Sequence, residues 1–336
     1  MKAGRMKDEF GDDLTTPRAS DLPDVPQMSD KSEIRHSPFA IPNSPRLPPW
    51  LRREKRDLAK IHETKKRLRG LALHTVCEEA RCPNLAECFA RTTAAFLLMG
   101  PVCTRACGFC NMAPGELRPL DPDEPARVAE AAATMGLRHI VLTSVTRDDL
   151  PRGGAGHFAA TAQAIERRLP EATIEVLTPD FQGDEDALAA VAAAPIDVFN
   201  HNLETVARLY PTARPQADYR RSLRVLGRMA KMRPGMAIKS GFMLGLGETP
   251  DEVRTLLADL RAAGATAVTI GQYLRPRLTN LPVARYAPPA EFAAWEAAAR
   301  ALGFRRVAAG PLVRSSYFAE KMMDDCSPQS HRGRRD

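Results

Sequence analysis

Short apolar runs alternate with longer amphipathic segments through most of this chain, beginning near residue 94. Six runs have the length and the β-branched or aromatic content of strands; they are 94–100, 138–144, 173–179, 196–202, 236–244 and 266–273. The segments between them have helical spacing and lie near 123–136, 155–169, 183–193, 203–210, 216–232 and 249–263. Six βα units in succession predict an α/β fold with a parallel sheet and outer helices, closed or partly closed as a barrel.

One helix start is marked especially well, in the stretch "GETPDEVRTLL". Thr249 stands where an N-cap belongs, Pro250 falls in the first turn, and Glu252 follows the threonine by three residues. This is the pattern of a capping box, in which the two side chains satisfy each other's backbone N–H groups. We therefore expect a helix to begin at Pro250.

Polar residues stand at the ends of five of the six predicted strands, although the strands themselves are apolar. They are Thr143, Ser144, Thr178, Asn200, His201, Asn202, Lys239, Ser240, Gln272 and Tyr273. In a βα barrel the C-terminal ends of the strands meet at one mouth, where the chemistry takes place. We expect a ligand there.

Composition divides the chain into four parts. Residues 1–45 are polar, Pro-rich and aperiodic, as in a disordered or loosely packed extension. Residues 46–93 hold a basic segment and a cysteine motif, residues 94–303 the predicted barrel, and residues 304–336 a C-terminal segment with a polar tail.

The overall composition is that of a globular protein. The chain has 336 residues, 44% of them hydrophobic and 26% charged, enough for a large core. No apolar run approaches the ~20 residues of a membrane span. The mixed charges of the N-terminal region match neither a signal peptide nor a transit peptide. We therefore expect a cytoplasmic protein, whose thiols stay reduced.

The formal net charge of +7 is concentrated in residues 46–70. This segment holds ten Lys or Arg and three acidic residues, a difference of seven that equals the whole surplus. It is either a solvated basic helix or a docking surface for an acidic protein or nucleic acid. Trp50 is its only aromatic residue, so base stacking is poorly supported and nucleic acid is the weaker option.

Six of the seven cysteines form two triplets within 34 residues: Cys77, Cys82 and Cys88, then Cys103, Cys107 and Cys110. In a reducing compartment such a cluster indicates metal binding or catalysis rather than disulfides. The second triplet follows the first predicted strand, and Gly108 within it permits a tight loop. Three thiolates can hold zinc with a fourth ligand from elsewhere, or three irons of a cubane cluster whose fourth iron stays open.

The stretch "CTRACGFCNM" resembles the signature of the radical S-adenosylmethionine (radical SAM) enzymes. Upstream, the Cys-x4-Cys-x5-Cys spacing resembles the auxiliary-cluster motif of the lipoyl synthases within that superfamily. The segments "TSVTRDDLPRGGAGHF", "FNHNLETV", "DYRRSL", "KSGFMLGLGET", "TIGQYLRP" and "GPLVRSSY" extend the resemblance over roughly residues 70–318. Thr146 departs from it, because an acidic residue is expected there, and this makes position 146 a poor candidate for catalysis.

The resemblance implies a partial (β/α)6 TIM-type barrel, two [4Fe–4S] clusters and S-adenosylmethionine. Cys103, Cys107 and Cys110 would hold the radical-generating cluster. Cys77, Cys82, Cys88 and Ser316, with Ser315 as the fallback, would hold an auxiliary cluster that gives up sulfur. A serinate is a harder ligand than a thiolate and should hold iron less well. The implied reaction inserts sulfur at C6 and C8 of a lysine-bound octanoyl chain.

The resemblance also suggests contacts and partners. Asn202, Glu204, Arg214 and Lys239 are candidates for contacts to S-adenosylmethionine or substrate, and Arg314 for steadying the charge near the serine. His157 and His201 receive no role, and Cys326 lies outside both motifs. The expected partners are octanoylated lipoyl carrier domains, a reducing protein such as a ferredoxin or flavodoxin, and iron–sulfur assembly proteins, with neither nucleic acid nor a membrane.

Two alternatives remain at this point. A sulfur-inserting enzyme similar to biotin synthase would take its second set of ligands from within the barrel, but no cysteine lies between Cys110 and Cys326. A zinc-binding nucleic-acid module would need fourth ligands close by, where His74 is the only histidine near the triplets. Anaerobically purified protein with about eight iron atoms would separate the cluster interpretation from zinc.

Overall fold

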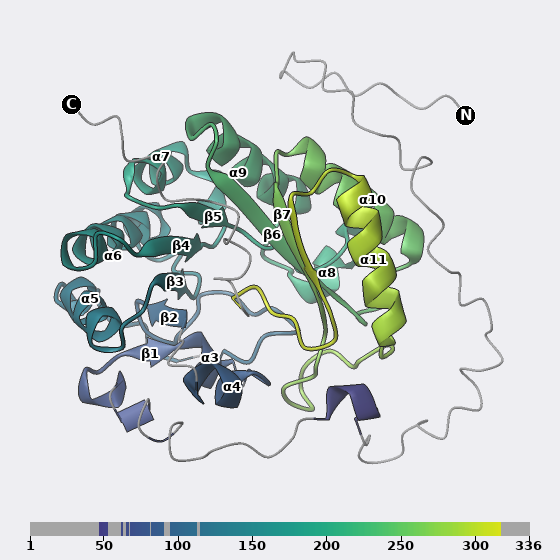
Figure 1. Ribbon diagram of the computed structural model, residues 1–336, viewed down its shortest axis with the longest axis horizontal. Helices are drawn as coiled ribbons and strands as arrows, with labels where there is room; N and C mark the ends of the chain where they lie inside the picture. The colour runs from purple at the N-terminus through teal and green to yellow at the C-terminus, as the bar shows by residue number, and fades with distance from the viewer. Residues whose placement is uncertain are drawn as a thin grey trace.

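The computed structural model describes residues 47–52, 62, 65–66, 68–80, 82–90, 95–112 and 115–316. Its centre is one sheet whose eight strands stand side by side in sequence order (Figure 1). The strands are β1 (His74–Thr75), β2 (Ala95–Leu98), β3 (His139–Ser144), β4 (Thr173–Leu177), β5 (Val198–Asn200), β6 (Ala237–Leu244), β7 (Ala267–Gln272) and β8 (Arg306–Ala309). From β2 to β8 every pair is parallel, while β1 pairs with β2 antiparallel.

All six predicted strands are confirmed, as β2 to β7. Two further strands, β1 and β8, were not predicted. They extend the sheet at its two edges. Because β8 pairs with β7, residues 306–309 of the predicted C-terminal segment are part of the sheet. The result is the expected partial barrel with one further parallel strand.

The outer layer consists of helices that return the chain between strands (Figure 1). The helices are α3 (Val76–Glu79), α4 (Leu85–Ala90), α5 (Glu124–Thr134), α6 (Ala155–Arg168), α7 (Glu185–Ala193), α8 (Tyr210–Ala213), α9 (Tyr219–Met232), α10 (Pro250–Ala262) and α11 (Pro289–Ala301). Five of the six predicted helices are confirmed, and α11 was not predicted. The capping box at α10 is present: Glu252 N donates to Thr249 Oγ1 (3.3 Å) and Thr249 N donates to Glu252 Oε2 (2.8 Å).

The helix predicted at 203–210 is wrong. Glu204 has a φ of +67° and forms an isolated bridge to Phe242 of β6. Its N–H donates to Gly241 O (3.0 Å) and its carbonyl accepts from Met243 N (2.9 Å). Only a short 3-10 turn at 207–209, followed by α8, remains helical. Backbone bonds to the neighbouring strand outweigh the apolar spacing that suggested a helix.

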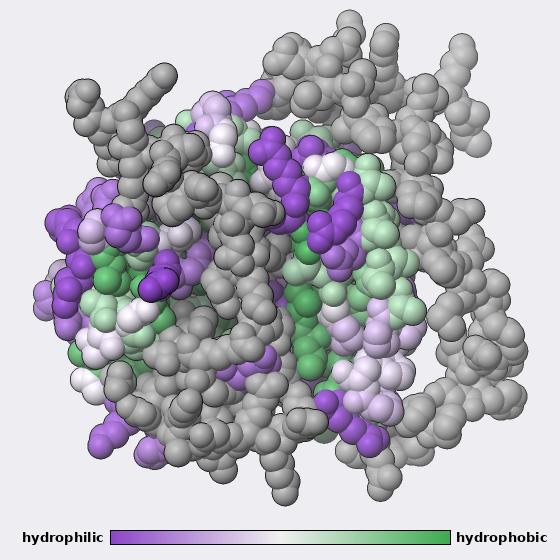
Figure 2. All heavy atoms as spheres, viewed as in Figure 1, coloured by the Kyte–Doolittle hydropathy of each residue, from purple (hydrophilic) through white to green (hydrophobic). Residues whose placement is uncertain are grey.

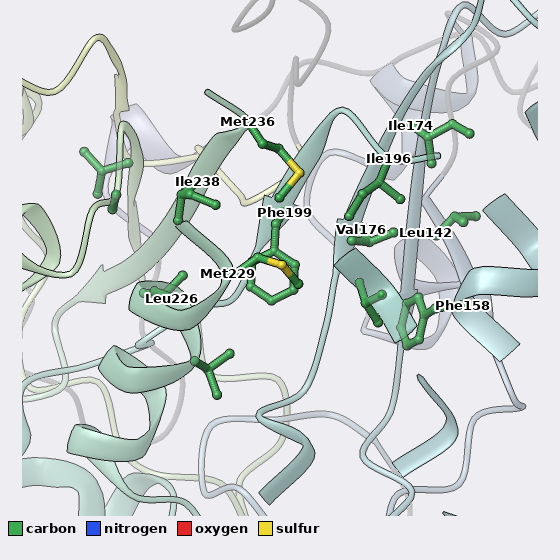
Figure 3. Packing of buried hydrophobic residues seen from close by; sticks show 14 of the residues in the cluster. Leu142, Phe158, Ile174, Val176, Ile196, Phe199, Leu226, Met229, Met236 and Ile238 are labelled. Carbon is green, nitrogen blue, oxygen red and sulfur yellow. The ribbon is translucent and has the colours of Figure 1, made fainter. Parts of the chain in front are cut away.

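Successive residues of each strand face opposite sides of the sheet, and this alternation separates the core from the barrel interior. Leu142, Val176 and Ile238 point outward and are fully or almost fully buried under the helices, with Phe158 and Met229 packed over the same layer (Figure 3). The residues between them in the strands point inward. The barrel interior therefore receives polar side chains from β3 to β6.

The outer surface is polar where the helices face water. Figure 2 shows hydrophilic side chains gathered over the flank at left, formed by α5, α6 and α7. In the part of the chain that the structure describes, every helix is too short or too polar to cross a bilayer.

Candidate functional site

A cavity of about 540 Å³ opens at the carboxyl ends of the parallel strands. Both cysteine triplets reach it: its wall includes Cys77 and Cys82 of the first and all three cysteines of the second. Cys88 lies half-buried in α4, away from the wall. Ser316 also lines the cavity, more than two hundred residues from the cysteines in sequence. All the candidate ligands predicted for the two clusters except Cys88 thus line one space.

Two side-chain amides hold the three ligand-bearing segments together. Asn84, between Cys82 and Cys88, is 1% exposed, and its Nδ2 donates to Leu312 O (2.7 Å), next to the serine pair. Asn111, directly after the second triplet, donates through Nδ2 to Glu79 O in α3 (2.6 Å). The acceptors are the backbone carbonyls of Leu312 and Glu79. These two hydrogen bonds therefore do not depend on the side chains of the accepting residues.

A buried ion-pair network fixes the loop of the second triplet. Arg105 lies between Cys103 and Cys107, and its side chain is only 5% exposed. It donates to Asp148 (2.7 and 2.9 Å) and to Asp180 (2.8 Å). Burial favours the neutral form of Asp180, but the Arg105 guanidinium outweighs it and holds the pKa of that carboxyl below its usual range. Arg105 thus works as a clamp on the loop.

The backbone at Thr146 also supports this loop. Its carbonyl accepts from both the N–H and the hydroxyl of Thr104, each at 3.0 Å. Position 146 therefore contributes its backbone to the site, which explains how the loop tolerates a threonine where the resemblance predicted an acid.

Gly108 is needed for space rather than for a left-handed turn. A Cβ built on it would lie 2.9 Å from Leu281 Cγ and 3.1 Å from Thr212 O. Its carbonyl accepts from Leu281 N (2.9 Å) and from Asn280 Nδ2 (3.1 Å). Asn280 also donates to Cys110 O (2.8 Å). The loop after β7 thus packs directly over the second triplet.

The thiols lie in surroundings that favour protonation until a metal replaces the proton. Burial raises the pKa of Cys77 to about 12 and that of Cys110 to about 11, and it also raises that of Cys107. Backbone N–H groups contact Sγ of Cys82 and Cys103, each at 3.4 Å. Metal binding at this site therefore has to release protons.

In the described ranges, no three His, Cys, Asp or Glu side chains converge on one ion position. A cubane cluster takes one thiolate for each iron, so its ligands stand apart around a bulky group. Five of the six cysteines fit that requirement, since they line one broad cavity.

The wall also carries two half-buried charged residues, Arg214 and Glu204. Arg214 donates through Nη1 to Asn202 O (2.9 Å), and Asn202 Nδ2 donates to Glu204 Oε1 (3.1 Å). Burial raises the pKa of Glu204, against the opposing effect of Arg214. The positive φ of Glu204 is a strained conformation for a residue with a side chain. Such strain is found most often at functional sites. The structure brings together three of the four predicted contact residues.

Several buried polar atoms of the wall have no hydrogen-bond partner among the described residues. They are Arg214 Nε, His201 Nε2, Thr178 Oγ1 and Ser144 Oγ. Because buried polar groups are nearly always paired, these atoms point to a polar ligand. Arg214 offers a donor on a cation, Glu204 a carboxylate, and the other atoms hydroxyl or ring partners. This set fits the polar groups of an amino acid joined to a nucleoside, as in S-adenosylmethionine.

No role was predicted for His201 from the sequence. Its Nδ1 lies 2.9 Å from Thr178 O, and because a carbonyl only accepts, Nδ1 carries the hydrogen. Burial lowers the pKa of His201 to about 4, so the ring is neutral and Nε2 is an acceptor. The only sequence signal for this role was its place at the end of a predicted strand.

Lys239 does not line the cavity. Its side chain is 2% exposed, and Nζ donates to both oxygens of Glu175 (2.9 and 3.0 Å) and to Ser315 O (2.7 Å). With all three hydrogens used, it has none left for a cofactor in this arrangement. Among the other predicted strand-end residues, Gln272 bonds only to backbone groups around it.

Comparisons with known proteins agree with this geometry. The family model described as the radical SAM superfamily matches residues 97–260, and that of the N-terminal domain of lipoyl synthase matches residues 22–82. A lipoyl synthase of Rubrobacter xylanophilus is 54% identical over 278 residues, covering 83% of this chain and 87% of the relative. One of Methylococcus capsulatus is 54% identical over 282 residues, covering 83% and 88%.

Solved structures share the fold at low identity. Streptococcus suis SuiB, bound to the precursor peptide SuiA, has a TM-score of 0.51 at 12% identity, over 68% of this chain and 52% of that one. HydG, described as a maturase of the [FeFe]-hydrogenase, has a TM-score of 0.50 at 14% identity, over 78% and 63%. These likenesses support the barrel architecture alone.

Proposed function

The chain belongs to the lipoyl synthase family of the radical SAM superfamily, and we propose how its residues share the reaction. That reaction inserts two sulfur atoms, at C6 and C8 of an octanoyl chain carried on a lysine of a protein domain. Its cofactors are [4Fe–4S] clusters and S-adenosylmethionine. The membership sets aside the biotin-synthase-like enzyme and the zinc module as alternatives.

The target carbons explain why the site holds so few acid–base candidates. An aliphatic C–H bond is not acidic enough for any side chain to deprotonate, so cofactors have to supply the difficult chemistry while the protein positions them. When bound, S-adenosylmethionine and a reduced cluster supply the hydrogen-abstracting radical, and an auxiliary cluster supplies the sulfur. One S-adenosylmethionine is consumed for each hydrogen removed, two in all.

The single cavity carries the assignment of ligands. Cys103, Cys107 and Cys110 would hold the radical-generating cluster on the wall supported by Arg105 and Asn280. A second set, on the side tied down by Asn84, would hold the auxiliary cluster: Cys77, Cys82, Cys88 and Ser316. Radical and sulfur would then reach one substrate chain between them, since both sets face the same space.

The charged wall suits the amino-acid part of S-adenosylmethionine. The Arg214 guanidinium, with Nε unpaired among the described groups, would bind the carboxylate. Glu204 would accept from the ammonium group, and Asn202 would hold the Glu204 carboxylate in place. A cationic partner would also favour the ionised form of Glu204, whose pKa burial raises. The neutral His201 would accept a hydrogen bond from a hydroxyl group through Nε2.

The basic segment at 46–70 is proposed to receive the acidic carrier domain. Lys65 and Arg69 pair with Glu78 of α3 (3.2 and 3.5 Å), one residue from Cys77. The basic side chains therefore stand beside the auxiliary set, where attraction would speed encounter with an acidic partner. Part of the segment, including Arg53, lies outside the described residues. We also propose that a ferredoxin or flavodoxin supplies electrons and that assembly proteins rebuild the cluster.

The main test of function is the product. Anaerobically reconstituted protein should hold about eight iron atoms, and with a reductant, S-adenosylmethionine and an octanoyl-lysyl peptide it should yield peptide with two added sulfurs. Changing Cys82 to Ala should abolish that product while 5′-deoxyadenosine still forms. Cys326→Ala, outside both motifs, is the matched control and should retain turnover. Two-sulfur product from Cys82→Ala would contradict the assignment.

Docking has its own test, the charge-reversed variant of Arg52, Arg53, Lys65 and Lys66. At low salt this variant should raise the KM for an acidic carrier domain at least about tenfold, and high salt should remove the difference. The control reverses Arg167 and Arg168, exposed at the far end of α6, and should leave KM unchanged. Equal turnover of both variants at low salt would disprove the docking role.

A further inference from the structure

Beneath the cavity, three polar side chains from neighbouring strands form a buried platform: Glu175 of β4, Asn200 of β5 and Lys239 of β6. They are 1%, 0% and 2% exposed. Lys239 Nζ donates to both Glu175 oxygens, and Asn200 Nδ2 donates to Glu175 Oε1 (2.8 Å). A buried ion pair of this kind is stable only when its remaining hydrogen-bonding groups are also satisfied.

The C-terminal serine segment, residues 312–316, completes the platform. The third hydrogen of Lys239 Nζ goes to Ser315 O (2.7 Å), and Asn200 Nδ2 also donates to Ser315 Oγ (2.8 Å). No described group other than Ser315 accepts these two bonds. Without the segment, a buried ammonium and a buried amide would each lose an acceptor. The platform and the segment therefore depend on each other.

The serine pair is not equivalent in this arrangement. Ser315 Oγ accepts from Asn200 and donates to Asn202 Oδ1 (3.0 Å), so its proton and an oxygen lone pair are both used. To ligate iron it would have to lose that proton and the bond to Asn202. Both serines line the cavity, but no described group hydrogen-bonds to the Ser316 hydroxyl. Ser316 is thus the hydroxyl available to a cluster.

Two further contacts fix the path of the segment. Asn84 holds Leu312 O, as described above. In β7, a Cβ built on Gly271 would lie 2.3 Å from Val313 O, so only glycine lets the segment pass this close to the strand. The segment is held at residues 312, 313 and 315, and residue 316 is the next one along.

We propose that Ser315 is an anchor rather than a cluster ligand. Glu175, Asn200 and Lys239 form the platform that binds Ser315, and this binding positions the neighbouring Ser316. This inference rests on the proposed function, because it assumes that Ser316 is the auxiliary ligand. The anchor also meets the charged wall, since Asn202 accepts from Ser315 and donates to Glu204.

The test compares cysteine variants of the two serines. Each is made in full-length protein whose radical triplet is changed to alanine, so that only the auxiliary cluster contributes to the Mössbauer spectrum. Ser316→Cys should replace the signal of an oxygen-bound iron with that of four thiolate-bound irons. Ser315→Cys should keep the oxygen-bound signal and about four irons. A four-thiolate signal from Ser315→Cys instead would overturn the proposal.

The platform is tested with Ser316 left in place. Lys239→Met should lose the signal of the oxygen-bound iron. The reference variant Ser316→Ala should lose the same signal. If Lys239→Met does not fold, the double variant Glu175→Leu, Lys239→Met removes both charges and serves in its place. With the radical triplet intact, either variant should form 5′-deoxyadenosine within about twofold of wild type while two-sulfur product falls at least tenfold. An unchanged oxygen-bound signal in the folded variant would sink the anchoring role.

These outcomes separate the anchor from the function itself. If wild-type protein made no two-sulfur product, the proposed function would fail whatever the spectra showed. If wild type made the product but its spectrum had no oxygen-bound iron, the assignment of Ser316 would fail. Only when wild type shows both do the platform variants decide whether the anchor is real, and then a normal spectrum refutes it.

Discussion

Removing the charge of Glu175 should cost the fold about 3 kcal/mol at neutral pH. The carboxylate is buried; burial acts to raise its pKa, but Lys239 and His139 outweigh burial and hold it at about 2, against an ordinary 4.5. That difference, at about 1.4 kcal/mol per pH unit, is worth about 3 kcal/mol. It agrees with the roughly 3–5 kcal/mol lost when one partner of a buried ion pair is removed.

The assay is urea unfolding of wild type and Glu175→Gln, both free of clusters and under reducing conditions. Because the folded pKa lies below the unfolded value, the stabilisation is fully present above pH 4.5 and is lost as the pH falls toward 2. The gap between the two proteins should therefore be about 3 kcal/mol at pH 7 and clearly smaller at pH 3.5, where part of the stabilisation has been lost. Taking the difference removes the effect of the other carboxyl groups.

Glu252 is the matched control, because its pKa is also held at about 2, chiefly by the Arg208 guanidinium. A quarter of its side chain is exposed, however, and its partner is more than half exposed. Water and salt screen such a pair, so Glu252→Gln should cost about 1 kcal/mol or less. If Glu175→Gln cost no more than Glu252→Gln, or if its gap to wild type did not narrow below pH 4.5, the reasoning from burial would be refuted.

The remaining predictions concern backbone placement near the clusters. Gly271→Ala should displace Val313 and lower bound iron from about eight toward about four atoms per chain, while 5′-deoxyadenosine formation continues. Gly156→Ala, in α6 with open space around it, is the control and should leave iron unchanged while stabilising the fold by up to about 1 kcal/mol. Asn280→Ala removes the bond to Cys110 O and should reduce 5′-deoxyadenosine formation and radical-cluster iron before it affects the auxiliary cluster. Iron analysis and product chromatography check all three, and equal loss of both clusters would contradict the assignments.

The barrel was predictable because its signal repeats. Each βα unit contains an apolar run and an amphipathic segment, and an error in one unit does not obscure the rest. The exceptions have local causes. β1 has only two residues, too few for a period to show, and β8 has a single β-branched residue, Val307, beside an arginine and two alanines. The segment at 203–210 has helical spacing, but its backbone bonds to β6 decide its conformation.

The proposed ligand residues could be named from the sequence in kind but not in arrangement. Spacing and resemblance predicted the cysteines and Ser316 as ligands, because a metal site demands particular residue types. Lys239 was expected to contact the cofactor or substrate because the resemblance implied it. Its actual partners are Glu175, 64 residues away, and Ser315, 76 residues away. No periodicity in the sequence reports such a pairing, which arises only when inward-facing positions of adjacent strands meet.

The buried platform gives a physical reason for placing a ligand so far along the chain. Residues 312–316 follow β8 in the chain, so they can bind side chains from strands throughout the sheet, as they do at Asn200 of β5 and Lys239 of β6. The platform offers a surface of such side chains, with one ammonium hydrogen and one amide hydrogen left over from its own bonds. Because both are deeply buried, an unseated segment is costly and a seated one is well ordered. Anchoring at Ser315 would therefore let Ser316, the proposed iron ligand, bind weakly without loosening the segment, and a weak ligand would suit a sulfur-donating cluster.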